Sequence, residues 1–214
     1  KGYFPAGPGN ANVNRSGGSH GGQGGTGGGA TYGSSNAPAD PGSSGGATSF
    51  GTGGGAGGGA IRIDASGTVT VNGSLTANGV GGSQNSGGGS GGSLHITCAS
   101  VAGTGTIQVK GGVANDKGDS AGSGGGGRLA LYFGQTDYFY GARTATGGLV
   151  NAWVSFPAKE GQTGTLVWQY TGADPLLTVR SSPTNTGSPA PRPFGGTPVL
   201  AGIDVTNTVA SPAG

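Results

Sequence analysis

The sequence predicts an all-β protein, specifically a glycine-rich stacked-strand solenoid or β-helix-like module with very little helix. Three observations lead to this prediction. Glycine supplies 55 of the 214 residues and proline a further 12, well above the usual proportions of a globular domain. Short segments alternate apolar and polar residues, which is typical of half-buried strands. These segments recur with a period near 35 residues, which is typical of repeat architectures.

Strand-like segments carry the repeat. The first follows Gly57–Gly59 and has Ile61 at a core position. The equivalent residues of the next three copies are Leu94, Leu129 and Leu166, and the successive spacings are 33, 35 and 37 residues. Within a copy every second residue is apolar, so one face of each strand can be buried. The apolar residues that we expect to stack in columns from copy to copy are Ile61, Ile63, Leu94, Ile96, Leu129, Leu131, Leu166 and Trp168. Residues 60–180 would then form a repeated β-strand module of about four rungs.

The glycine runs beside these strands allow two interpretations. As corners of a solenoid, they would supply the positive φ or the close backbone contact that a turn between rungs requires. The run Gly21–Gly29 reads GGQGGTGGG, in triplets that suit extended helices of the polyproline II or polyglycine II type. Such helices satisfy their backbone through neighbouring chains. Ordered extended segments and mobile loops are both open for Gly17–Gly59, and residues 1–59 are treated as one glycine-rich N-terminal segment.

Residues 181–214 form a third region. Proline, serine and threonine dominate Ser181–Pro193, which predicts an extended linker. After the linker, apolar and polar residues alternate again within Val199–Val209, which predicts a terminal strand. This strand can fold back onto its own chain, or it can add to the edge of the next subunit. Its candidate assembly residues are Val199, Leu200, Ile203, Val205 and Val209.

Groups with catalytic or metal-binding chemistry are few. His20 lies in a glycine run and His95 on the outward face of a strand, and neither has a carboxylate pattern near it. The segment Asn115–Asp119 lacks the ligand spacing of a calcium-binding loop. The single cysteine, Cys98, is in phase with apolar neighbours, which favours a buried inert thiol over an intermolecular disulfide. No glycine run matches a phosphate-binding or dinucleotide-binding loop. We therefore expect no enzyme activity, no catalytic residue, no metal and no cofactor.

Charge and hydropathy exclude two further kinds of partner. Ten basic and eight acidic residues give a net charge of +2, which is too small for a polycation that binds nucleic acid. The sequence has no run of 18 apolar residues, so we expect no membrane span.

Aromatic residues gather in the second half of the chain. Tyr138, Phe139 and Tyr140 are consecutive and are candidate binding aromatics, because exposed aromatic rings stack on sugars or bury subunit contacts. The alternative is that they build a larger hydrophobic core in this half. Asn14 and Asn72 each begin an Asn-x-Ser sequon and are candidate glycosylation sites in a secretory pathway that glycosylates.

The order of these motifs resembles a known class of sequence. The triplet glycine run is followed by GGGAGGGAIRIDASGTVTVNGSLTANG, then by GGGSGGSLHIT and GGGGRLALYF. In this order the chain is similar to the glycine-rich repeat segments of very large secreted or surface β-solenoid-like proteins, mostly bacterial, over Gly17 to Phe133. The resemblance implies an extracellular, repetitive β module, and it implies no catalytic residues.

We expect a non-enzymatic extracellular or cell-surface structural protein. The leading hypothesis is a subunit of a filament, fibre or surface matrix that associates with its own copies, with the C-terminal strand as the link between subunits. The alternative is an adhesin or carbohydrate-binding module whose partner is a glycan. The third is an ice-binding protein, which the irregular spacing of the outward threonines disfavours.

Overall fold

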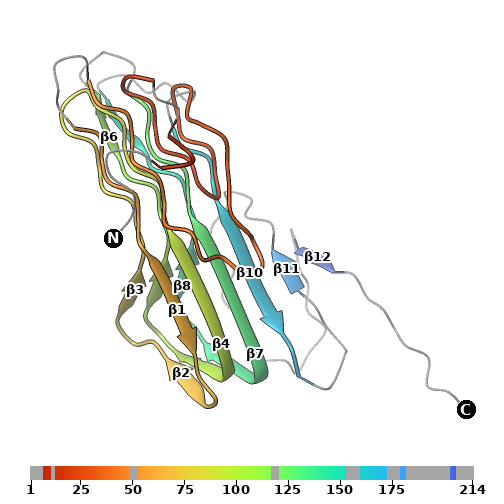
Figure 1. Ribbon diagram of the computed structural model, residues 1–214. Coiled ribbons are helices and arrows are strands. Elements are labelled where there is room, and N and C mark those ends of the chain that lie inside the picture. Colours follow the sequence, from red (N-terminus) through yellow and green to blue (C-terminus); the bar gives the residue numbers. More distant parts are fainter. Residues whose placement is uncertain are drawn as a thin grey trace, which may run out of the picture.

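Strands and extended glycine segments make up the molecule (Figure 1). The computed structural model describes residues 7–10, 13–48, 53–116, 121–152, 160–172, 179–181 and 203–205. No helix occurs among them. The strands β1, β2, β4, β7 and β10 lie toward one end of the molecule, and the glycine segments run on from them to the other end, where β6 lies (Figure 1).

The main sheet is parallel. Its central order is β1 (Ala60–Asp64), β4 (Ser93–Gly103), β7 (Arg128–Phe139) and β10 (Thr165–Tyr170), and β2 (Thr68–Thr70) also pairs with β4. The long strand β4 therefore pairs with β1 along its first half and with β2 along its second half. A register shift between Cys98 and Ser100 separates the two halves, as a β-bulge does where a strand bends.

A second parallel sheet contains three short strands. They are β3 (Ser74–Thr76), β5 (Thr106–Gln108) and β8 (Ala142–Thr144), in that order. Two pairs of strands complete the described structure. β6 (Ala114–Asp116) runs parallel to β9 (Val150–Ala152), and β11 (Val179–Ser181) runs antiparallel to β12 (Ile203–Val205).

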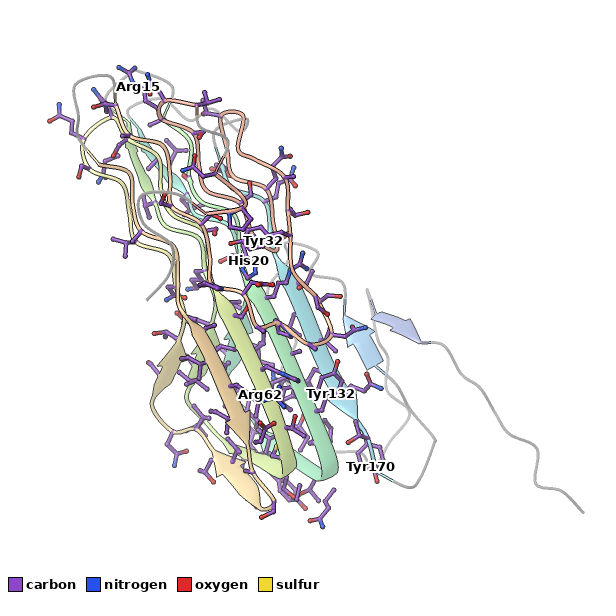
Figure 2. The ribbon with its side chains drawn as sticks, in the orientation of Figure 1. Arg15, His20, Tyr32, Arg62, Tyr132 and Tyr170 are labelled. Carbon is purple, nitrogen blue, oxygen red and sulfur yellow. The ribbon has the colours of Figure 1, made fainter. Side chains whose placement is uncertain are left out.

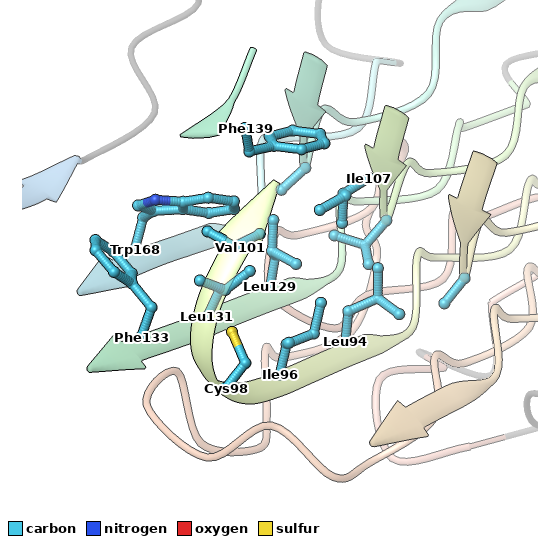
Figure 3. Close-up of a cluster of buried hydrophobic side chains, with 13 residues drawn as sticks. Leu94, Ile96, Cys98, Val101, Ile107, Leu129, Leu131, Phe133, Phe139 and Trp168 are labelled. Atoms are coloured by element: carbon cyan, nitrogen blue, oxygen red, sulfur yellow. The ribbon is translucent and has the colours of Figure 1, made fainter. Parts of the chain in front are cut away.

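The hydrophobic core contains residues of the main sheet and of the three-stranded sheet (Figure 3). Every second residue in the first half of β4 and of β7 points into it, which is why the sequence alternates there. Ile107 from the second sheet and Phe139 from the end of β7 are fully buried in the same cluster. The labelled members of the cluster are Leu94, Ile96, Cys98, Val101, Ile107, Leu129, Leu131, Phe133, Phe139 and Trp168 (Figure 3).

The prediction of a stacked-strand solenoid or β-helix-like module is wrong. In the part of the chain that the structure describes, the strands divide among four separate sheets, three parallel and one antiparallel, and no solenoid is shown. The physical reason lies in the glycine runs, which are not corners between rungs. Among the described glycines only Gly7, Gly27, Gly33 and Gly103 have positive φ. The other described glycines of the runs therefore do not make left-handed turns; they continue the strands as extended segments that lie side by side.

Backbone hydrogen bonds join these extended segments directly. The Gly88 N–H donates to the Gly122 carbonyl at 3.0 Å, and the Gly88 carbonyl accepts from the Gly18 N–H at 2.9 Å. Three glycine runs that are far apart in the sequence thus meet at one residue. A Cβ atom on Gly88 would lie 2.7 Å from the Gly112 carbonyl carbon and 3.0 Å from the Gly124 nitrogen. The backbones are so close that no side chain fits between them, and this is why glycine is required here.

Candidate functional site

The predicted columns of apolar residues are register partners in the main sheet. Ile61 pairs with Leu94, Leu94 with Leu129, and Leu129 with Leu166. The same holds two residues further along each strand, for Ile63, Ile96, Leu131 and Trp168.

The first strand of the main sheet leaves this core open at one edge. β1 pairs with β4 on one side, and among the described residues no strand pairs with its other side. The consequence is visible in burial. Leu94 and Ile96 on β4 have no exposed surface, whereas their partners Ile61 and Ile63 on β1 are only partly buried. The other apolar residues at this edge of the core, which are also partly buried, are Val69, Val71 and Leu75.

Two opposite charges mark the outward face of β1. Arg62 Nε donates to Asp64 Oδ2 at 2.6 Å, with side chains that remain 67% and 52% exposed. This hydrogen bond lowers the pKa of Asp64 below its usual value. Figure 2 shows Arg62 on β1 at this edge of the sheet. The edge therefore combines a half-buried isoleucine row on one face with an exposed ion pair on the other.

The opposite end of the core is closed by polar residues. Asp137 of β7 is the register partner of Val101 on β4, and Arg143 of β8 is the register partner of Ile107 on β5. Two core positions that are aliphatic in the second repeat are therefore charged in the third. The sequence carried a signal for this, because aligning the third copy on the second places Arg143 in an apolar phase. Arg143 was not among the core or site residues expected from the sequence.

These two charges pair with each other and with an aromatic ring. Arg143 Nη2 lies 3.6 Å from Asp137 Oδ2, and the guanidinium stacks 3.8 Å above the Trp168 ring. Trp168 Nε1 donates to Asp137 Oδ2 at 2.6 Å. The side chains of Arg143 and Asp137 are only 17% and 13% exposed. Burial lowers the pKa of Arg143. This polar cap covers the end of the core that is remote from β1.

A second polar cluster lies where the glycine segments meet the sheet (Figure 2). His20 is fully buried, and its Nδ1–H donates to the Gly91 carbonyl at 2.9 Å. Its ring lies 4.7 Å from that of Tyr32, whose carbonyl accepts from Arg128 Nε at 2.7 Å. His20 Nε2 is buried without a partner. Burial, with a smaller contribution from Arg128, lowers the pKa of this imidazole, and the Gly91 bond and Asp40 oppose the shift. The neutral histidine joins the glycine segments to the sheet.

Two of the three candidate binding aromatics are exposed. Tyr138 and Tyr140 have 55% and 52% of their surface in solvent. Phe139 between them has none, and it packs 5.8 Å from Trp168. Its selection as a binding aromatic is therefore corrected: strand alternation turns Phe139 into the core and leaves the two tyrosines outside.

The other sequence-predicted residues lie apart from one another. Asn14 and Asn72 are exposed. Cys98 is buried, and burial raises the pKa of its thiol. His95 lies on the outward face of β4 with its ring 5.9 Å from Tyr132. Among the residues that the structure describes, no group of histidine, cysteine, aspartate or glutamate could hold a metal ion.

The candidate assembly residues of the tail are partly within the described structure. Ile203 and Val205 belong to β12, where they pair with Ser181 and Val179 of the same chain. Val199, Leu200 and Val209 lie outside the described residues. Residues 117–119, which belong to the segment Asn115–Asp119 that was compared with a calcium-binding loop, also lie outside them.

Comparisons with known proteins identify no relative. No family model, no curated protein and no solved structure matches the chain. A search of the described residues for a helix long and apolar enough to cross a membrane finds none.

Proposed function

We propose that the protein is a non-enzymatic structural protein of the extracellular space or the cell surface, and that it is a subunit of a filament, fibre or matrix. The observation that carries this proposal is the open edge of the core at β1. The partly buried Ile61 and Ile63 would gain burial if another strand covered them, and burying apolar surface is the main driving force for association. An uncovered parallel edge also offers backbone donors and acceptors to a further strand.

The glycine layer supports the same role. Its segments bind one another through backbone groups, as at Gly88, and they continue the strands of the sheet. A layer held by main-chain bonds between distant runs resists local opening, which suits a protein whose task is shape. The C-terminal strand remains a candidate second link between subunits.

Electron microscopy of the full chain, beside a variant that lacks Pro198–Gly214, tests the proposal. We expect ordered polymers from the full chain. Their loss in the truncated chain would make the terminal strand a link between subunits, and their persistence would leave the contact to the sheet. Discrete monomers from both chains under all assembly conditions would contradict a structural role.

A second candidate function rests on the two exposed tyrosines. Tyr138 and Tyr140 lie two residues apart in the sequence and are both about half exposed, and a sugar could stack on exposed aromatic rings of this kind. Glycan-array binding that is lost in Tyr138→Ala with Tyr140→Ala, and kept in Tyr138→Phe with Tyr140→Phe, would favour a carbohydrate-binding module. Binding that is absent, or equal in the two variants, would remove this candidate.

A further inference from the structure

The sequence of β1 is complementary to itself when it is read in the antiparallel direction. From Ala60 the chain reads Ala-Ile-Arg-Ile-Asp-Ala. If two copies of this strand are placed antiparallel with Ile63 at the centre, Arg62 of each copy faces Asp64 of the other. Ile63 then faces Ile63 of the second copy, and Ile61 faces Ala65. Opposite charges meet on the outward face, and apolar residues meet on the core face.

We infer that two copies of this chain pair through β1, antiparallel and about a two-fold axis at Ile63. The inference rests on the proposed structural role and names its contact. A two-fold axis perpendicular to the sheet keeps the core faces of both copies on the same side. The half-buried row of Ile61, Ile63 and Ala65 is then continued by the same row of the second copy, so one sheet extends through both molecules.

Neighbouring registers are less favourable. Centring the pair on Arg62 places two arginines opposite each other, and centring it on Asp64 places two aspartates opposite each other; like charges directly across a strand pair are destabilising. A shift by one residue in the pairing brings Arg62 opposite Ile63, which turns the isoleucines of one copy to solvent and its charges to the core. Only the register centred on Ile63 satisfies both faces.

The other edge of the sheet matches this contact less well. On its outer side β10 also pairs with no described strand, but β11 of the same chain lies beside it (Figure 1), and Trp168 of β10 is nearly buried against Asp137 and Arg143. In an isologous contact the same edge serves both partners, so pairing through β1 closes as a dimer. A filament then needs a second contact between dimers, for which the C-terminal strand is the candidate.

Disulfide cross-linking of the full chain tests this register. In a Cys98→Ala background, Arg62→Cys chains are mixed with Asp64→Cys chains and oxidised. Directly opposed residues lie about 4.5–5.5 Å apart between Cβ atoms and diagonal ones about 7–8 Å. We therefore expect the mixture to yield mainly the mixed dimer, with several-fold less cross-linking in either variant alone. Equal yields in all three samples would overturn the register.

Charge exchange provides the second measurement, read as the dimer dissociation constant by light scattering at low salt. Arg62→Asp turns two cross-strand attractions into repulsions and should raise this constant about tenfold. The exchange Arg62→Asp with Asp64→Arg restores opposite charges across the axis and should return the constant to near its original value. Both side chains are exposed, so far-UV circular dichroism should be unchanged in all variants.

The outcomes separate this inference from the proposed function. Polymers of the original chain without the mixed disulfide would overturn the β1 contact and leave the structural role in place. A chain that stays monomeric at all concentrations would overturn both. A parallel, head-to-tail polymer through β1 would also overturn the two-fold contact.

Discussion

Replacing Gly88 with alanine perturbs the glycine layer at a point where three runs meet. The new Cβ atom would lie 2.7 Å from the Gly112 carbonyl carbon, and closer still to its oxygen. Ordinary contact needs at least about 3.4 Å, so the backbones must separate by several tenths of an ångström or more. The two hydrogen bonds of Gly88, at 3.0 Å to Gly122 and 2.9 Å from Gly18, would be lost or weakened. Buried backbone groups left without partners cost about 1–3 kcal/mol for each bond, which makes a loss of about 2–6 kcal/mol.

Gly67→Ala is the matched control for this substitution. Gly67 is exposed, its φ is not positive, and no heavy atom lies within 4 Å of the position of its Cβ. This variant should be neutral or more stable by up to about 1 kcal/mol, because alanine restricts the unfolded chain. Urea unfolding followed by circular dichroism measures both variants. Equal midpoints for Gly88→Ala and Gly67→Ala would refute the argument that close backbone approach requires glycine in this layer.

Two further predictions concern buried charge. Asp137→Ala leaves Arg143 without its counter-ion in the core and should lower the free energy of unfolding by about 3 kcal/mol. Asp137→Val with Arg143→Leu introduces the aliphatic residue types that the earlier copies have at these register positions, and it should recover most of this loss in the same urea titration. A double variant no more stable than Asp137→Ala would contradict the account. The lowered pKa of His20 means that the folded state binds fewer protons than the unfolded state below about pH 6.5. Stability should therefore fall as the pH falls through this range, with Arg128 opposing the imidazolium and Asp40 favouring it. His20→Gln should show a smaller fall than the original chain between pH 7.5 and pH 5; an equal fall would exclude His20 as the cause.

The strand pairing of the main sheet could be predicted from the sequence to a large extent. Alternation of period two identifies the core face of β4 and β7, because side chains alternate across a strand. The spacing between copies identifies the partners, so Ile61, Leu94 and Leu129 occur in one column as expected. The alternation and the spacing both involve apolar side chains that are buried in the core. Both patterns can therefore be recognised in a single sequence.

The role of the glycine runs could not be predicted in the same way. A glycine has no side chain to report its surroundings, so a corner, a loop and a close-packed extended segment share one composition. The difference is made by partners far away in sequence, such as Gly122 and Gly18 for Gly88. The polar cap differs, because aligning the third copy on the second places Arg143 opposite Ile107, in an apolar phase. This alignment does not identify the partners of Arg143, because Trp168 and Asp137 are brought to it by other strands.

Amide hydrogen exchange can show whether the glycine runs are bound to one another by buried backbone hydrogen bonds. The N–H groups of Gly88, Gly112 and Gly124 have carbonyl partners at 3.0, 2.7 and 2.9 Å. We expect these three amides to exchange as slowly as those of Ile96 and Leu131 in the central strands. Exchange of the glycine amides at the rate of an unstructured peptide, beside slow exchange in the strands, would contradict this expectation.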